Sequence, residues 1–497
     1  MLNYNRRGVF TELSRSRSKI MYSMPSVPAI FSPGGTVPSQ GGLGAANNPM
    51  RAPAFAFAVI LIFLRFSMVH QIQAQLMGVN LYLLYVFGIP ALIGIFAIGG
   101  FQRTLQWRPG LYWTLFGVWL LVGVPFSSWR VASLGVVLTY FRTELLMMFI
   151  IAGAASKWRD CRKVMVAIAL AAVISLAAAK LFSHVDDNQR MSLNFGTIAN
   201  SNDYAGHLIF VLPFLLWVVM TSKTLVFRVA AFALIPYGLY VILSTASRGA
   251  LIAIGVGAVY AFFAGSARIR IAMGVLLPLV FVVAISLLPQ RAWQRLLSFS
   301  DDSTGNEEAV ESTETRKYLL QTSLLFMVEH PLFGVGADQF SGVEGKASRQ
   351  IGKLGVWHAT HNSFTQVGSE CGLPALYFFL AGIGSSLLLL NRVYRSSRDR
   401  PEYQEISATA FCLMLSLVSF CAAITFLNFG YFFYLPAMGG LAICVAKTAE
   451  EEFKKTGSAV PATAPVIQPV TPFVRRRAPQ PNFPQKIVPP VRPTRLR

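Results

Sequence analysis

The chain has 497 residues, of which 54% are hydrophobic and only 13% charged, and its mean hydropathy is +0.52. Lys and Arg outnumber Asp and Glu by 43 to 22, so the formal net charge is +21. The 38 phenylalanines and the few charges exclude a disordered chain. Basic residues that sit between long apolar runs do not fit a nucleic-acid-binding fold. An integral membrane protein remains, in which a basic excess belongs to the cytoplasmic connections.

About twelve apolar runs are candidates for transmembrane helices, since roughly 20 residues cross a bilayer as a helix. In chain order they are 53–69, 79–99, 110–126, 134–155, 164–182, 203–221, 228–244, 250–264, 271–288, 373–391, 407–427 and 431–446. Alternation from a cytoplasmic N-terminus puts most basic residues on one side, and the opposite short connections hold only Arg130, Arg190 and Arg248. This bias predicts an all-α polytopic membrane protein with both termini in the cytoplasm.

The predicted spans divide the chain into regions of different character. Residues 1–52 are expected to be a disordered, basic cytoplasmic N-terminus, and residues 447–497 a basic, Pro-rich cytoplasmic tail. The tail either binds anionic lipid headgroups or only reinforces the topology. Residues 53–288 hold the first nine helices and residues 373–446 the last three. Residues 289–372 form one long connection on the outer side, and a loop of this length usually carries function.

The long outer connection contains a candidate amphipathic helix, Thr315–Glu329, which Pro331 stops. Arg316 stands at its predicted start, where a basic residue is unfavourable unless an anion compensates. The alternative is an ordinary solvated charge. The apolar residues of this helix are expected to lie on the membrane surface; they are Leu319, Leu320, Leu324 and Phe326.

Titratable groups gather on the outer side, so a functional site is expected there. The densest cluster runs from Trp357 to Phe364, just before the tenth span. Neutral His361 can act as a general base, and Asn362 can orient a substrate oxygen or the imidazole. His358 and His361 share a face if this segment is helical. Zinc would need a third ligand, and the competing interpretation is that these residues bind lipid headgroups at the interface.

Two further polar groups lie at outer helix ends. Arg248, between Ser247 and Gly249, offers a planar fork of donors that suits phosphate, although an arginine at a helix end also snorkels to the interface. Asn202 belongs to the segment 200–203, which either caps the sixth span or lines a cavity.

Two charges, Arg142 and Glu144, fall within the fourth span, where charged residues are functional candidates. They are two positions apart and therefore do not face each other on a helix. Each needs a partner on another helix or a polar cavity.

Several of these segments together resemble the O-antigen ligase and O-antigen polymerase superfamily of bacterial envelope glycosyltransferases. His361 and Asn362, followed after nine residues by Gly372-Leu-Pro, match the family's pattern before a span. The resemblance covers about residues 190–440. Its other segments are Arg316-Lys-Tyr-Leu-Leu, His330-Pro331-Leu-Phe-Gly334-Val-Gly336 with Phe340, Ser247-Arg248-Gly249 and Asn200-Ser-Asn202-Asp203-Tyr-Ala.

The resemblance implies a GT-C-like helical fold and an inverting, metal-independent transferase without a cofactor, in the bacterial inner membrane, with the long loop between helices 9 and 10 in the periplasm. Its donor is a glycan on undecaprenyl diphosphate, and its acceptor is a glycan or a lipid A-core hydroxyl. Carried over by motif, Arg248 and Arg316 bind the diphosphate and His361 is the catalytic base. The remaining residues expected to bind substrate are Asn362, His358 and Asn202.

A twelve-span transporter or flippase of a glycolipid is the alternative function. Transporters usually show internal repeats and a site near the bilayer midplane. This sequence shows no matching halves, and its polar groups gather at the outer face. If the protein is a transferase, ligation to lipid A core, polymerisation of repeat units and transfer to protein hydroxyls all stay open.

Overall fold

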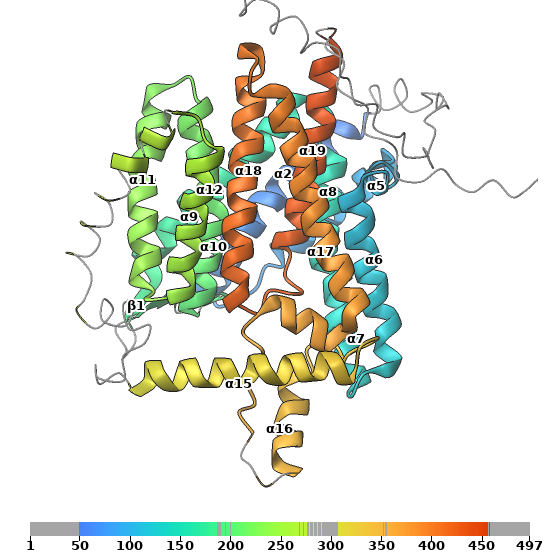
Figure 1. Cartoon of the computed structure of the whole chain (residues 1–497). Helices are drawn as coiled ribbons and strands as arrows, with labels where there is room; N and C mark the ends of the chain where they lie inside the picture. Colours follow the sequence, from blue (N-terminus) through green and yellow to red (C-terminus); the bar gives the residue numbers. More distant parts are fainter. Residues whose placement is uncertain are drawn as a thin grey trace, which may run out of the picture. The chain divides into compact units, whose positions relative to one another are not determined.

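The computed structural model describes residues 49–455 and 457, apart from short gaps (Figure 1). The gaps are 186–189, 194, 199, 268, 272, 276–277, 279–281, 283–285, 287–289, 291–306, 351 and 353–354. The predictions for residues 1–48, for most of the ninth span and for the basic tail lie outside the described residues.

Helices make up nearly all of the described regular structure (Figure 1). They are α2 (Arg51–Ser67), α3 (Val69–Met77), α4 (Leu83–Ala97), α5 (Gly100–Leu105), α6 (Arg108–Gly123), α7 (Arg130–Thr139), α8 (Leu146–Ala154), α9 (Trp158–Phe182), α10 (Ser201–Thr221), α11 (Leu225–Ser244), α12 (Arg248–Ala264), α15 (Glu307–Glu329), α16 (Phe340–Gln350), α17 (Ser363–Ser397), α18 (Gln404–Ala423) and α19 (Tyr434–Lys455). Short 3₁₀ turns, a π-helix and a two-stranded antiparallel sheet complete it: η1 (Val124–Phe126), η2 (Tyr140–Leu145), η4 (Pro401–Tyr403), η5 (Ile424–Phe426), β1 (Ser183–Val185) and β2 (Met191–Leu193).

Seven of the described helical segments are long and apolar enough to cross a membrane, or eight if the bent pair α2 and α3 counts as one span. The expectation of an α-helical, polytopic membrane protein is therefore confirmed. Helices α4 and α12 are apolar but too short to be counted among these spans by themselves. The count of about twelve spans and the GT-C-like arrangement stay predictions.

Contacts between helix ends agree with the predicted alternation of sides. At one end, Arg51 of α2 pairs with Asp160 of α9 at 3.3 Å, and the sequence places both on the cytoplasmic side. At the other end, the Ser133 hydroxyl donates to the carbonyl of Ala337 at 2.9 Å, and the sequence places both on the outer side. Residues predicted to share a side thus lie together at both ends.

Helix α17 begins earlier than the tenth span, which the sequence predicts at 373–391. The Asn362 side chain caps it, because Oδ1 accepts hydrogen bonds from the backbone N–H groups of Phe364 (2.9 Å) and Thr365 (3.2 Å). The helix is broken at Gly372, where φ is 83° and ψ is 172°, and Pro374 follows. Helix α17 therefore consists of a polar part before Gly372 and an apolar part after it, and only the apolar part is the predicted span.

The turn 331–336 packs backbone to backbone against the break in α17. The N–H of Leu373 donates to the carbonyl of Pro331 at 2.7 Å, and the N–H of Val335 donates to the carbonyl of Ser369 at 2.9 Å. The Pro-Gly-rich turn and the Gly-Leu-Pro motif noted in the sequence are thus two halves of one contact, which requires glycine where the two backbones approach most closely.

Gly334 provides a test of this contact. Its φ is 64°, and a Cβ there would lie 2.3 Å from the carbonyl carbon of Glu370. An alanine in a left-handed conformation costs about 1–2 kcal/mol before any clash. We therefore expect Gly334→Ala to lower the melting temperature of the purified protein in detergent by a few degrees. Gly342→Ala is the control, because nothing lies within 4 Å of a Cβ there. Equal melting temperatures for the two variants would contradict this role.

Helix α15 extends over Glu307–Glu329, so it ends where the sequence predicts but begins before Thr315. Arg316 consequently lies inside the helix, and the expectation that it stands at a helix start is wrong. The polar residues 307–314, which resemble a loop by composition, form the first turns. The suggestion of an anionic ligand at Arg316 therefore does not follow from the helix dipole.

The apolar residues of α15 divide between two environments. Leu319 is 0% exposed and Phe326 is 6% exposed, and both pack with Phe340. Leu320 and Leu324 are exposed, at 39% and 47%. The expectation that all four lie on the membrane surface is wrong for Leu319 and Phe326, because protein covers them. Figure 1 shows α15 running across the ends of the spanning helices, with α16 beyond it.

The sequence predicts that the carboxylate of Glu144, within a span, needs a partner on another helix, and the structure provides one. Nη2 of Arg65, on α2, lies 2.9 Å from both carboxylate oxygens. The Arg142 guanidinium faces elsewhere and lies 5.9 Å from the ring centroid of Tyr85. Glu144 and Arg142 thus have separate partners on other helices, as their spacing predicts.

Candidate active site between the outer helix ends

His361 lies in the connection between α16 and α17, directly before the capping residue Asn362. Its φ is 52°, which is uncommon for a residue with a side chain, and the side chain is half-buried. The connection is not helical, so His358 and His361 do not share a helix face. Their ring centroids nevertheless lie 6.2 Å apart, with His358 exposed to solvent.

The surroundings of His361 favour a neutral imidazole. Burial is the main cause that lowers the pKa of His361 from 6.5 to about 4, and the charges of Arg316 and His358 lower this pKa as well. A charge affects a pKa in this way only when it is near. Arg316 of α15 is therefore within electrostatic reach of His361.

The residues on both sides of His361 are fixed to the connection between α18 and α19. The Thr360 hydroxyl donates to Oδ1 of Asn428 at 3.0 Å. The Ser363 hydroxyl donates to the carbonyl of Leu427 at 2.7 Å and accepts from the N–H of Phe429 at 2.8 Å. These bonds hold the His361 backbone in place from before and after, which gives a potential base a defined position.

Arg248 is the first residue of α12, and the side chain of Ser247 caps this helix. The next residue, Gly249, packs closely on Phe426: a Cβ at Gly249 would lie 2.7 Å from the Phe426 Cβ. Phe426 lies in the α18–α19 connection, directly before Leu427 and Asn428, which bond the residues on either side of His361. The structure thus attaches the start of α12 and the His361 segment to the same stretch of chain.

Asn202 has a defined role in this region. The Asn200 side chain caps α10 by accepting the N–H of Asn202 at 2.8 Å, so the capping interpretation of this segment is confirmed. Oδ1 of Asn202 accepts a hydrogen bond from Nη2 of Arg190 at 2.9 Å, and Nε of Arg190 donates to the carbonyl of Thr245 at 3.1 Å. Asn202 is therefore linked to the turn that leads into α12.

Arg190 is a residue of this region that the sequence did not single out as a site residue. The signal was present, because Arg190 is one of three basic residues in the short outer connections. Its partners are distant in the chain and could not be read from spacing. The structure places it between the start of α10 and the turn before Arg248.

Glu370, on the short helical segment before the break in α17, is a second such residue. Its carboxylate accepts the N–H groups of Asp338 (2.9 Å) and Phe340 (3.3 Å) and the hydroxyl of Tyr431 (2.6 Å). It therefore caps α16 and connects it to the chain that precedes α19. A lone Glu just before the predicted tenth span was the only sign in the sequence.

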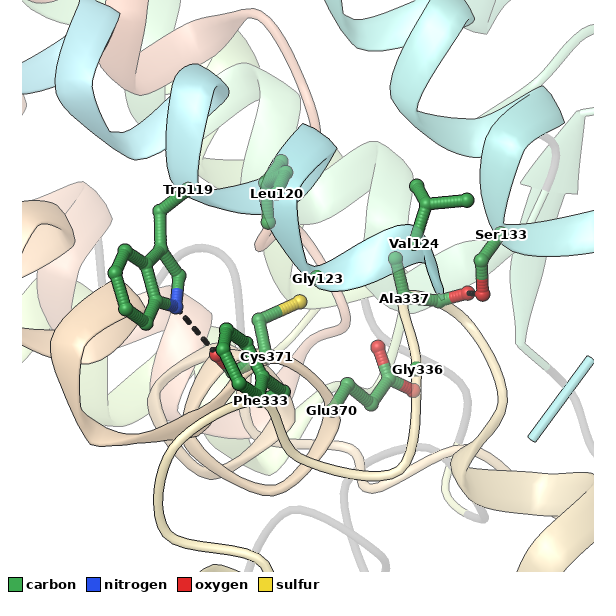
Figure 2. Close-up of a pocket in the computed structure, with 10 residues that line it drawn as sticks. All are labelled: Trp119, Leu120, Gly123, Val124, Ser133, Phe333, Gly336, Ala337, Glu370 and Cys371. Atoms are coloured by element: carbon green, nitrogen blue, oxygen red, sulfur yellow. Dashed lines mark hydrogen bonds between the residues drawn. The ribbon is translucent and has the colours of Figure 1, made fainter. Parts of the chain in front are cut away.

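A small pocket lies between the end of α6, α7, the turn after α15 and the break in α17 (Figure 2). Its polar groups are already paired: Nε1 of Trp119 donates to the carbonyl of Cys371 at 3.1 Å, and the Ser133 hydroxyl bonds Ala337. None of the site residues expected from the sequence is among the residues that line it. The pocket is thus distinct from the region around His361.

The fold and these contacts define a polytopic α-helical membrane protein with a histidine and arginines near one set of its helix ends. A family model described as O-antigen ligase matches residues 233–380, a stretch that contains Arg248, Arg316 and His361. Over this stretch the chain is similar to the O-antigen ligase family. The match indicates a glycosyltransferase-type enzyme with glycan and lipid-linked substrates. No curated protein matches the chain.

Proposed function

We propose that the protein transfers a glycan from undecaprenyl diphosphate to an acceptor hydroxyl at the periplasmic face of the bacterial inner membrane. In this proposal both termini are cytoplasmic and the connection 289–372 is periplasmic. The observation that carries the proposal is the proximity of a neutral, anchored His361 to Arg316 inside the stretch that matches the O-antigen ligase family. A base and a phosphate-binding cation are the two groups that this reaction needs.

The proposed reaction is a single displacement at C1 of the donor sugar. Neutral His361 takes the proton of the acceptor hydroxyl as its oxygen attacks C1. The bond between C1 and the diphosphate oxygen breaks, and the electron pair stays on undecaprenyl diphosphate. Attack from the side opposite to the leaving group inverts C1. Arg316 and Arg248 stabilise the growing negative charge by charge-assisted hydrogen bonds, a role that requires no metal and no cofactor.

The position of Arg248 at the start of α12 supports its assignment to the diphosphate. The N-terminal end of a helix carries a partial positive charge and presents N–H groups that bind anions. An anion bound at this position is attracted both by the helix N-terminus and by the guanidinium. The seventeen-residue α12 therefore adds its dipole to the guanidinium charge.

The other expected substrate-binding residues take supporting parts in the proposal. His358 is exposed beside His361 and is assigned to the acceptor side. Oδ1 of Asn362 is occupied by the α17 cap, so Asn362 contributes its amide N–H groups. Asn202 accepts a hydrogen bond from Arg190 and in this way helps to fix the turn before Arg248.

The pH dependence of transfer is a direct consequence of the low pKa of His361. The acid limb of kcat/KM reports the free enzyme, and the base must be deprotonated. We expect kcat/KM to stay constant well below pH 6.5 and to fall only as the pH approaches about 4. A bound diphosphate favours the imidazolium, so the limb of kcat should lie at a higher pH. A half-maximal kcat/KM at pH 6.5, measured by initial rates in vesicles, would contradict this environment.

Deletion of the gene in the source bacterium tests the proposed function in the cell. We expect undecaprenyl-diphosphate-linked glycan to accumulate while mature surface glycan is lost. Loss of all attached polymer identifies a ligase, whereas a single repeat unit on the acceptor identifies a polymerase. Unchanged surface glycans and unchanged levels of the lipid-linked glycan would overturn the proposal.

A further inference from the structure

Helix α16 carries a buried carboxylate that holds the chain leading to His361. Glu344 is 1% exposed. Its Oε2 accepts the backbone N–H of Trp357 at 2.8 Å, and its Oε1 accepts the backbone N–H of Val356 at 3.2 Å. Hydrogen bonds between a carboxylate and backbone N–H groups are charge-assisted and stronger than neutral ones. Glu344 thus fixes the backbone four residues before His361.

The same carboxylate also reaches α15. The hydroxyl of Tyr318 donates to Oε1 of Glu344 at 3.1 Å, and Tyr318 follows Arg316 by two residues. The hydroxyl of Ser348, on α16 itself, donates to the same oxygen at 3.0 Å, and its Oγ lies 3.1 Å from the Tyr318 hydroxyl oxygen. One buried carboxylate therefore connects the helix that carries Arg316 with the segment that carries His361.

The chain around Glu344 is shaped for this connection. A Cβ at Gly355 would lie 2.5 Å from the Cα of Gly345, so the two backbones are in close contact. Trp357 has a φ of 57° and packs its ring on Gly345, with the Arg349 guanidinium 5.0 Å from the ring centroid. The glycines and the left-handed conformation of Trp357 thus allow the segment to lie directly against α16.

An arrangement of this kind is not needed to stabilise a surface helix. Burying a carboxylate is costly unless hydrogen bonds compensate, and an apolar residue would pack at lower cost. What the carboxylate provides is a fixed geometry between α15, α16 and the segment 355–361.

We propose that Glu344 is a positioning residue that sets the distance between Arg316 and His361. The proposal rests on the proposed function, in which these two side chains act on one substrate. Glu344 acts through them and has no assigned contact with the substrate. Tyr318 contributes to the same positioning, because its hydroxyl makes the hydrogen bond between Glu344 and α15.

The charge of Arg316 supplies a readout of this distance. Arg316 and His358 are the charged groups that act on the His361 imidazole, and both lower its pKa. If the link through Glu344 and Tyr318 is lost, Arg316 is no longer held near His361 and its effect on the imidazole weakens. The pKa of His361 then rises toward 6.5 by the part that Arg316 contributes, which is smaller than the part that burial contributes.

The test follows the His361 imidazole by NMR titration of the purified full-length protein with labelled histidine in detergent. The His361 signal is identified by its loss in His361→Gln. Tyr318→Phe and Glu344→Ala remove the link, whereas Ser341→Ala changes a hydroxyl on the first turn of α16 that is not part of the link. We expect a higher pKa of His361 in Tyr318→Phe and Glu344→Ala, and no change in Ser341→Ala. An unchanged pKa in a folded Tyr318→Phe overturns the proposal, and this variant lacks only one hydroxyl should Glu344→Ala fail to fold.

Transfer rates measured on the same samples separate the two proposals. A misplacement of about 1 Å costs roughly 10²-fold in rate, so we expect kcat to fall in Tyr318→Phe with little change in the KM for the donor. A wild-type protein that shows no transfer refutes the proposed function, whatever the titration shows. Active wild-type protein with an unmoved His361 pKa in Tyr318→Phe refutes the positioning role alone.

Discussion

Replacement of His361 by alanine is expected to lower glycan transfer by roughly 10²–10⁴-fold, the usual contribution of a general base. The reason is that the bonds of Thr360 and Ser363 to the α18–α19 connection fix His361 at this position. Among the residues that the structure describes, no other group is anchored there in this way. The measurement is the rate of transfer to an acceptor hydroxyl by purified protein in vesicles. Donor binding should change little, because the base acts on the acceptor.

Two variants control for effects on folding. His361→Gln keeps a polar side chain of similar size and should be as inactive as the alanine variant, since an amide cannot accept the proton. His330→Ala removes an exposed histidine on the turn after α15 and should retain transfer. Normal transfer by His361→Ala at wild-type membrane levels would refute the assigned base.

Replacement of Arg248 or Arg316 by alanine is expected to weaken binding of the lipid-diphosphate donor by roughly 10–10²-fold each, because a hydrogen bond to a charged group contributes about 1.5–3 kcal/mol. The lysine variants should recover only part of this loss, since lysine keeps the charge but not the planar fork. Binding of undecaprenyl-diphosphate glycan to the purified protein measures the effect.

Neighbouring basic residues supply matched controls for the arginine variants. Lys317 follows Arg316 on α15 and is exposed, and Arg130 is an exposed arginine at the start of α7. Alanine at either position should leave donor binding unchanged. Unchanged binding in both Arg248→Ala and Arg316→Ala would refute the diphosphate clamp, and an equal loss in Lys317→Ala would point to a general electrostatic effect instead.

Apolar runs and the distribution of basic residues predict most of the helices, because a membrane imposes length and sidedness on each span. The errors occur where polar residues form helices. The segment from Ser363 to Glu370 is polar by composition but lies in α17, since Asn362 caps it and partners on other elements satisfy its side chains. Residues 307–314 likewise belong to α15, which moves Arg316 away from the helix start.

Some residues of the candidate site can be recognised from the sequence and others cannot. His361, Arg316 and Arg248 are recognisable from motif segments and their order in the chain. Arg190 and Glu344 are not, because their roles depend on partners that are near only in the fold: Thr245 for Arg190, and the 356–357 backbone for Glu344. Hydrophobic periodicity and spacing report neighbours along one element, and these contacts join different elements.

The most direct test of the central claim is transfer by the purified protein in vesicles that contain a synthetic undecaprenyl-diphosphate glycan and an acceptor glycan. We predict formation of a new glycosidic bond with release of undecaprenyl diphosphate in wild-type protein, and its loss in His361→Ala. Movement of the lipid-linked glycan across the bilayer without bond formation would contradict the transferase function and identify a transporter.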